Sequence, residues 1–473
     1  MYTLGCKVNQ AESQAILDEM RKDGWQPVPF QGPASLYIVN TCTVTGAAEQ
    51  KSAKVIRGAR KYNPGAMLAV IGCSVEADRE AKAKDAESAG LERAGLGRID
   101  LLAGNGQKGE FPAMAEALWQ HRYEAEERQA LWREDTAEKG EEGEEGQQKA
   151  SIYGIDRTRA MMKVQDGCRQ FCSYCIIPYV RRAWESMPIE EAVLRTKRLV
   201  DEGYRETVLL GIHLGAYGQE EGKRDRLAIL LDELLGTFPM MRFRLGSVEP
   251  MEASDRLIQT IRDHPNACKH LHLPLQSGSD AVLQAMGRPY TTAAFRGKIE
   301  SIRQAAPEIA LTTDMMVGFP GEGEEEHSCS LAFAEEMAFS RMHVFAYSRR
   351  PGTPAAGLPR QVAKAVKDRR SKEMIRLGRH MQEAYGQSQT GRVLEVLLEE
   401  ETEAGCWIGY SGNYLQVAYQ PSGSARSDFK GEVLPLRVTG KSLIKQGAWQ
   451  GEAQEMGGGQ PHVTWMASTD ESE

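Results

Sequence analysis

The chain contains no apolar run long enough to cross a bilayer and no charged-then-apolar start of the kind found in signal peptides. It has no positive excess either: 58 basic residues face 66 acidic ones, and the formal net charge of −8 argues against a general nucleic-acid coat. Nine cysteines, an odd number at uneven intervals, argue against a disulfide framework. These absences predict a cytoplasmic protein with no membrane partner, whose cysteines serve metal or redox chemistry.

The negative charge is concentrated in one segment. Residues 121–150 hold ten Asp or Glu and five Lys or Arg, and Gly140–Gln148 within them is rich in Glu, Gly and Gln. This composition predicts an acidic flexible linker over residues 121–152. The length of 473 residues predicts two or three folded domains around it.

Residues 1–120 alternate between short apolar runs and helical stretches, which predicts a small doubly wound α/β domain. The expected strands are Tyr2–Leu4, Leu36–Val39, Met67–Ile71 and Ile99–Ala103. The first is short, so the domain either tolerates half a strand or starts upstream of Met1.

The same alternation continues through residues 153–385 and predicts six βα units. The expected strands are Met161–Gln165, Thr207–Gly211, Arg242–Gly246, His270–Leu275, Leu311–Val317 and His343–Ser348. Helical stretches such as Pro188–Glu202 and Glu324–Ala338 separate most of them. Right-handed crossovers would curl six such units into an open partial (βα)6 barrel.

A basic amphipathic helix is expected over residues 361–385, followed by a small β-barrel over 386–445 and a disordered tail over 446–473. The barrel strands are expected at Arg392–Leu398, Tyr414–Ala418 and Glu432–Thr439. The helix could follow RNA phosphates, although an ordinary solvated helix face is the alternative. The candidate RNA-binding residues are Lys364, Lys367, Arg369, Arg370 and Arg376.

The most informative motif is Cys168-x3-Cys172-x2-Cys175. Three thiolates within eight residues can bind three irons of a cubic iron–sulfur cluster and leave the fourth iron open for a small molecule, whereas most Fe–S proteins supply four cysteines. A zinc loop completed by a distant His or Cys is the alternative. The motif follows the first barrel strand, so the site should lie at the mouth of the barrel.

Three more cysteines stand one βα unit apart in the N-terminal domain. Cys6, Cys42 and Cys73 each follow a predicted parallel strand, so their side chains should converge and form a second three-thiolate site. Taken alone, a cysteine at a strand end often only packs. Cys268 and Cys329, like Cys406, have no ligand spacing and are expected to be small buried residues.

The Cys168 motif resembles that of the radical S-adenosylmethionine (SAM) enzymes, and Met1 to about Thr439, without the acidic insert, resembles their methylthiotransferase family. Further matching segments are Gly211–Gly218, Arg244–Pro250, His270–Ser279 and Asp314–Glu322. Leu4–Gln10 and the triplet His213-Leu214-Gly215 look most like the subgroup acting on N6-threonylcarbamoyladenosine in tRNA. Two segments depart from the family pattern: Val180–Met187, which carries fewer positive charges, and Ser74–Glu76.

The resemblance implies two [4Fe–4S] clusters, one at Cys168, Cys172 and Cys175 that binds SAM, and one at Cys6, Cys42 and Cys73 that carries the sulfur. It also implies a TRAM-type RNA-binding β-barrel, a tRNA anticodon loop as substrate, and an electron donor such as flavodoxin or ferredoxin. The product would carry a 2-methylthio group on the adenosine beside the anticodon. The candidate cofactor-binding residues are Tyr174, Gly211, His213, Ser247, Glu249 and Gln276.

Other interpretations stay open at this stage. A methylthiotransferase for isopentenyladenosine in tRNA, or for a ribosomal-protein aspartate, would share the cluster residues. A non-catalytic zinc or Fe–S RNA-binding protein would leave the second triad unexplained. His272, Asp314 and Glu322 could face the barrel interior and act there, or they could simply be buried and hydrogen-bonded.

Overall fold

The computed structural model describes residues 1–83, 96, 98–122, 158–421, 428–441 and 448–453. All but the first two residues of the predicted linker, 121–152, lie outside this part of the chain, as does most of the predicted tail. The chain divides into two compact units, Met1–Ala384 and Tyr385–Glu473. Within the described residues, no helix combines the length and apolar character that a membrane span requires.

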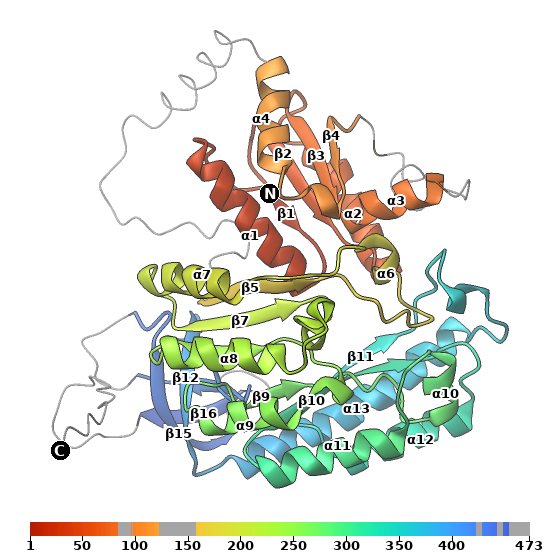
Figure 1. The fold of residues 1–473 in the computed structure, drawn as a ribbon, viewed down its shortest axis with the longest axis vertical. Helices are drawn as coiled ribbons and strands as arrows, with labels where there is room; N and C mark the ends of the chain where they lie inside the picture. The colour runs from red at the N-terminus through yellow and green to blue at the C-terminus, as the bar shows by residue number, and fades with distance from the viewer. Residues whose placement is uncertain (84–95, 97, 123–157, 422–427, 442–447, 454–473) are drawn as a thin grey trace. The chain divides into compact units, whose positions relative to one another are not determined.

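The first part of the chain is a three-layer α/β fold around a parallel sheet (Figure 1). The sheet order is β1 (Tyr2–Thr3), β2 (Leu36–Thr41), β3 (Met67–Gly72) and β4 (Leu101–Ala103). Helices α1 (Lys7–Lys22) and α4 (Phe111–Arg122) pack on one face, and α2 (Gly46–Ala59) and the start of α3 (Cys73–Ala83) on the other. The central strands β2 and β3 are apolar and almost wholly buried because helices cover both of their faces. The predicted doubly wound domain is confirmed.

Six further parallel strands form the partial barrel. They are β5 (Arg159–Asp166), β7 (Glu206–Gly211), β8 (Arg242–Leu245), β9 (His270–His272), β10 (Ala310–Val317) and β11 (Arg341–Ala346). The hydrogen-bonded sheets β6-β5-β7-β8 and β11-β10-β9 are joined by the bridges Ser247 to His272 and Phe243 to Ala267, and the short β6 (Glu185–Ser186) is antiparallel to β5. The predicted (βα)6 barrel is therefore confirmed.

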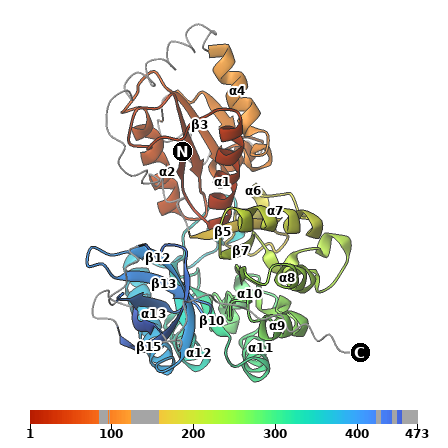
Figure 2. The same cartoon turned by 90° about the vertical axis from the view of Figure 1, so that its left-hand side faces the viewer.

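Helices cover the outer face of these strands, as Figures 1 and 2 show. They are α7 (Ile189–Asp201), α8 (Arg226–Thr237), α9 (Asp255–Asp263), α10 (Asp280–Ala285), α11 (Thr292–Ala305), α12 (Glu324–Met337) and α13 (Lys364–Ser388). The short α6 (Ile177–Val180) instead packs against Cys73 and Ala77 of α3. Short 3-10 turns are η1 (Asn105–Gln107), η2 (Leu214–Ala216), η3 (Gln219–Glu221), η4 (Pro250–Glu252) and η5 (Pro354–Gly357). Alternate strand residues such as Leu209, Phe243 and Leu311 pack against the helices. The residues between them, among them Arg244 and Thr312, point to the inner face.

Strand β9 is shorter than expected. It ends at His272, whereas the sequence predicted a strand through Leu275. Pro274 has no amide hydrogen for the ladder, and the amide of Leu275 donates to the Thr313 hydroxyl rather than to a strand carbonyl (N–Oγ1 3.0 Å). Gln276 takes a left-handed conformation (φ 69°) and bridges Met315 of β10 through its backbone.

The second unit contains a closed β-barrel. Its strands follow the order β12 (Val393–Glu401), β13 (Trp407–Ser411), β14 (Gln416–Tyr419), β16 (Trp449–Ala453) and β15 (Val433–Lys441). Strands β13 and β16 were not predicted, and β16 lies inside residues 446–473, which were expected to be disordered. That expectation is wrong for Trp449–Ala453, because the Trp449 indole is buried in the core and β16 closes the ring between β14 and β15.

The three cysteines without ligand spacing are not alike. Cys268 and Cys406 are buried, as expected for small apolar side chains. Cys329, on α12, is exposed, so the expectation of burial is wrong there. His327 and Ser330 of α12 are buried, whereas the helical period turns Cys329 to the outward side of the helix.

Candidate active site

The Cys168 motif occupies the loop between β5 and α6, at the carboxyl end of the barrel strands as predicted. Gly167 starts this loop with φ 78°, and a Cβ there would lie 1.4 Å from the carbonyl oxygen of Ala183. The Asp166 carboxylate accepts from the Gly167 amide (2.8 Å), and the Gln165 amide donates to the Gly167 carbonyl (2.8 Å). Hydrogen bonds to both its amide and its carbonyl therefore fix Gly167, the residue before the first cysteine.

The three thiols of this loop lie close enough to influence one another. Burial, together with the neighbouring Cys172 and Cys168, raises the pKa of Cys175 to about 12. Burial also raises the pKa of Cys172, against the opposing charge of Arg288. Thiols with raised pKa values stay protonated at neutral pH, so binding to iron would displace their protons.

Two cationic side chains reach the sulfurs of this motif. His213 Nδ1 lies 3.6 Å from Cys168 Sγ, and Arg288 Nη1 lies 3.5 Å from Cys172 Sγ. Although burial opposes the charged imidazole, the hydrogen bonds with Cys168 and Glu252 raise the pKa of His213 to about 10. Hydrogen bonds to cluster sulfurs are one means by which proteins set a cluster's reduction potential.

The remaining cofactor candidates lie around the same end of the barrel. Tyr174 is packed against Val282 and Met286, and Glu249 pairs with Arg288. Gly211 ends β7, where a Cβ would lie 2.9 Å from Gln165 Oε1. The exposed Ser247 follows β8, and Gln276 follows β9 and contacts β10 through its backbone (N–Asp314 O 2.8 Å). Arg288 was missed by sequence reasoning, because it lies 116 residues beyond Cys172 and belongs to no ligand motif.

Cys6, Cys42 and Cys73 also converge. Cys42 follows β2, while Cys6 immediately precedes α1 and Cys73 is the first residue of α3. Helix N-termini favour thiolates, because the backbone dipole is positive there. Burial, together with the nearby Cys73 and Cys6, raises the pKa of Cys42 to about 11. The three thiols are near enough to influence one another, and their role as the ligands of one site stays a prediction.

Two glycines allow this convergence. Gly5 precedes Cys6 with φ 97°, and a Cβ there would lie 2.7 Å from Cys42 Sγ. Gly72 precedes Cys73 with φ 99°, and a Cβ there would lie 2.5 Å from Asn40 Oδ1. Both positions combine a left-handed backbone with a close approach, so the loops can meet only if these residues lack side chains.

The two thiol groups adjoin within the first unit. Ile176, Ile177 and Val180, which follow Cys175, pack against Cys73. The Asn105 amide donates both to Cys73 Sγ (3.5 Å) and to the Val180 carbonyl (2.9 Å). Ion pairs also join α1, which follows Cys6, to β5, which precedes Cys168. One of them is Lys163 Nζ to Glu12 Oε1 at 2.9 Å.

The predicted RNA-binding residues of α13 differ in their surroundings. Lys364 is exposed, and Arg376 is exposed in an open groove that Arg369 also lines. Arg369 pairs with Glu324 (2.6 Å) and Glu373 (3.3 Å). Lys367 donates to the Tyr347 carbonyl (3.0 Å).

Arg370 lies on the opposite side of α13. Its side chain is 2% exposed and bound to the Glu322 carboxylate (2.8 Å). The prediction that Arg370 binds RNA is therefore wrong, because its side chain faces the interior and pairs there with Glu322.

A partial (βα)6 barrel with a Cys-x3-Cys-x2-Cys loop at the carboxyl ends of its strands is the arrangement of a radical SAM enzyme. The sequence pattern of the radical SAM superfamily matches residues 162–332, and that of the uncharacterized protein family UPF0004 matches residues 1–91. Enzymes of the superfamily use SAM and a [4Fe–4S] cluster, and Cys168, Cys172 and Cys175 stay the predicted ligands of that cluster.

Curated relatives match nearly the whole chain. Threonylcarbamoyladenosine tRNA methylthiotransferase MtaB of Bacillus subtilis is 36% identical, covering 92% of this chain and 92% of that protein. The protein of the same name from Aquifex aeolicus is 31% identical (88% and 95%), and tRNA-2-methylthio-N(6)-dimethylallyladenosine synthase of Carboxydothermus hydrogenoformans is 32% identical (94% and 97%). The chain belongs to the methylthiotransferase family of radical SAM enzymes.

Among solved structures, the radical SAM methyltransferase TsrM of Kitasatospora setae is similar, with a TM-score of 0.49 and 13% identity over 72% of this chain and 68% of that chain. This likeness is too distant to carry information about function.

Proposed function

We propose that this enzyme adds a methylthio group to carbon 2 of N6-threonylcarbamoyladenosine in tRNA, beside the anticodon. The observation that carries the proposal is the pair of adjoining three-thiol groups within one unit. A methylthiotransferase must both activate SAM and deliver sulfur, and two groups of three ligands provide one open iron for each task. The identity to the Bacillus subtilis relative supports threonylcarbamoyladenosine as the modified base.

In this proposal Cys168, Cys172 and Cys175 hold the cluster that supplies the electron for SAM cleavage. The chain's own residues hold the parts in place. Arg288 contacts both the Glu249 carboxylate and Cys172 Sγ. His213 contacts Cys168 Sγ. Tyr174 closes the loop from the apolar side, which excludes water from the site. SAM would contact the rim formed by Gly211, Ser247 and Gln276.

Cys6, Cys42 and Cys73 would hold a second [4Fe–4S] cluster, which would carry the sulfur that is transferred. The convergence of three thiols, two of them at helix N-termini, supports this role. Asn105 would orient Cys73 and the chain after Cys175 at the same time.

We further propose that the closed barrel of the second unit and the exposed cations of α13 bind the tRNA. Lys364, Arg369 and Arg376 are accessible for phosphate contacts, which give a salt-dependent affinity. A structured anticodon loop presents bases that are already splayed for reading. The electron would come from a small donor such as flavodoxin or ferredoxin.

The proposal is tested by anaerobic reconstitution with iron and sulfide, followed by iron counting, SAM-cleavage assays and mass spectrometry of tRNA nucleosides. We expect about eight irons per chain, falling to about four in either triple Cys→Ala variant. The Cys168/Cys172/Cys175 variant should lose SAM cleavage, whereas the Cys6/Cys42/Cys73 variant should retain cleavage but form no methylthio product. Cys329→Ser, at an exposed cysteine, is the matched control and should behave as wild type. About four irons in the wild type would contradict the second cluster.

The substrate is tested separately. The similarity to the Carboxydothermus hydrogenoformans synthase makes isopentenyladenosine the second candidate. Two tRNAs that carry either threonylcarbamoyladenosine or isopentenyladenosine should be offered in competition. We expect the methylthio product on the first. A methylthio product found only on the isopentenyladenosine tRNA would overturn the proposed substrate but would not affect the cluster assignment.

A further inference from the structure

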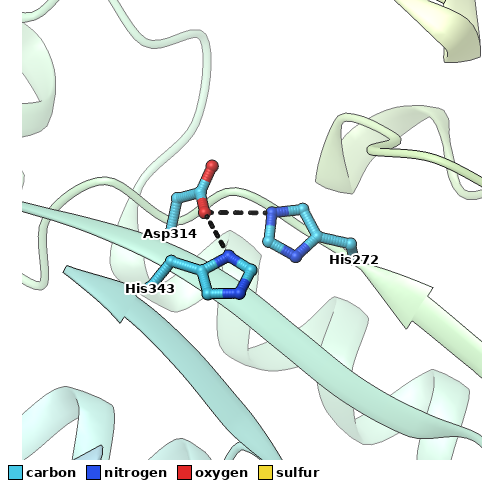
Figure 3. A group of neighbouring side chains, drawn as sticks. All are labelled: His272, Asp314 and His343. Carbon is cyan, nitrogen blue, oxygen red and sulfur yellow. Dashed lines mark hydrogen bonds and ion pairs between the residues drawn. The ribbon is translucent and has the colours of Figure 1, made fainter. Parts of the chain in front are cut away.

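Three side chains outside both cysteine groups meet on the inner face of the barrel (Figure 3). His272 comes from β9, Asp314 from β10 and His343 from β11, so three adjacent parallel strands each supply one residue. Their ligand atoms all lie within 4.8 Å of one another. Asp314 and His343 are direct register partners, which fixes their spacing through the backbone ladder.

The distances match those between ligands of one metal ion. Asp314 Oδ1 lies 3.2 Å from His272 Nε2 and 3.3 Å from His343 Nδ1. For metal–ligand bonds of about 2.0–2.1 Å, two ligand atoms at a tetrahedral or octahedral angle are about 2.9–3.4 Å apart. Both measured separations fall in this range. The two imidazole rings are stacked at 29°, so their nitrogens address the same carboxylate oxygen from neighbouring positions.

A hydrogen bond with a neighbouring side chain orients the His272 ring, as is common for histidines that bind a metal. His272 Nδ1 lies 2.9 Å from Thr312 Oγ1, and the same hydroxyl lies 2.9 Å from His270 Nε2. If Nδ1 donates to the hydroxyl and the hydroxyl donates to His270, the lone pair of His272 Nε2 is directed at Asp314. A second-shell hydrogen bond that fixes the tautomer in this way is a regular feature of histidine ligands.

We propose that His272, Asp314 and His343 bind one divalent first-row transition-metal ion, such as Zn²⁺, that is separate from the iron–sulfur clusters. Two imidazoles and one carboxylate suit such ions better than Mg²⁺ or Ca²⁺, which prefer oxygen ligands. The site is open on one side: the His272 side chain is 10% exposed, whereas that of His343 is 45% exposed. Three protein ligands therefore leave positions for water or for an oxygen donor of a substrate.

The nearby arginines do not compete for the site. Arg244 faces the same inner surface, but its Nε is bound to the Glu206 carboxylate (2.7 Å), which also pairs with Arg242. Asp314 Oδ1 lies within contact distance of both histidines, and the Asp314 backbone carbonyl accepts from the Gln276 amide, which ties the site to the loop at the mouth of the barrel.

The test uses the holoenzyme with both clusters loaded, so that the six cluster cysteines cannot bind added metal. Zn²⁺ is equilibrated with the protein by dialysis, and zinc and iron are counted in the same sample by mass spectrometry. We expect about one Zn²⁺ per wild-type chain above background. His343→Gln and Asp314→Asn should weaken this binding by more than about tenfold while the iron count stays unchanged.

The matched control is His264→Asn. His264 Nε2 also pairs with a carboxylate, Asp232 Oδ1 at 2.9 Å, but no third ligand joins them among the described residues. This variant should bind zinc as the wild type does. Equal zinc binding by the wild type, His343→Gln and Asp314→Asn, or none by the wild type, would overturn the proposal and leave a hydrogen-bonded His–Asp–His cluster. His343→Gln keeps the test valid if Asp314→Asn fails to fold, because His343 is partly exposed.

Discussion

Arg181 and Glu12 form a buried, two-pronged ion pair. Arg181 Nη1 lies 2.7 Å from Glu12 Oε1, and Nη2 lies 2.9 Å from Oε2. Glu12 belongs to α1, directly after the Cys6 loop, and Arg181 follows α6, directly after the Cys175 loop. Burial alone would raise the pKa of the Glu12 carboxyl, but the hydrogen bond from Arg181 and the charge of Lys108 hold it well below its usual range. This ion pair thus joins the segment that follows Cys6 to the segment that follows Cys175.

Arg181→Met should destabilise the folded protein by about 3–5 kcal/mol, because Glu12 would keep its charge in a buried place without its main partner. Chemical denaturation measures this free energy of unfolding. The adjacent Arg182→Met is the control: its side chain is 64% exposed and pairs with Glu80 at the surface, so the expected loss is at most about 1 kcal/mol. Similar losses for both variants would contradict the role given to Arg181.

Gly5→Ala should disturb the Cys6 group while sparing the Cys168 group. The new Cβ would collide with Cys42 and would also strain a left-handed backbone. Reconstituted protein should contain about four irons rather than about eight and should still cleave SAM. Gly24→Ala separates the two effects, because Gly24 has φ 91° but nothing within 4 Å of the new Cβ. Iron loss in both variants would point to backbone strain alone.

Arg288→Gln should make the reduction potential of the cluster at Cys168, Cys172 and Cys175 more negative. The substitution removes a positive charge 3.5 Å from Cys172 Sγ, and a nearby cation favours the reduced, more negative cluster. A potentiometric titration followed by electron paramagnetic resonance measures the shift. Arg296→Gln, at an exposed ion pair with Glu336, should leave the potential unchanged.

Neutralising Lys364, Arg369 and Arg376 together should weaken tRNA binding and flatten its salt dependence. The slope of log affinity against log salt should fall by about 2 if these side chains neutralise phosphates. Arg370→Gln should instead lower stability, because Glu322 would lose its buried partner. An unchanged salt slope in the triple variant would exclude α13 from the RNA interface.

The elements and the convergence of the cysteines were predictable, because both follow from local patterns. Cys6, Cys42 and Cys73 stand one βα unit apart, and the carboxyl ends of parallel strands meet at one edge of a sheet. The burial of Arg370 was not predictable, since it depends on Glu322 in a distant loop. The same is true of Arg288, which reaches Cys172 only after the chain has passed four further strands.

The position of β16 has a consequence for synthesis. This strand pairs with both β14 and β15, so the ring cannot close until Ala453 has left the ribosome. Until then two strand edges and the apolar barrel core stay exposed to other chains. We therefore expect nascent chains that stop before Trp449 to be the form most dependent on chaperones, whereas the first unit can already be complete.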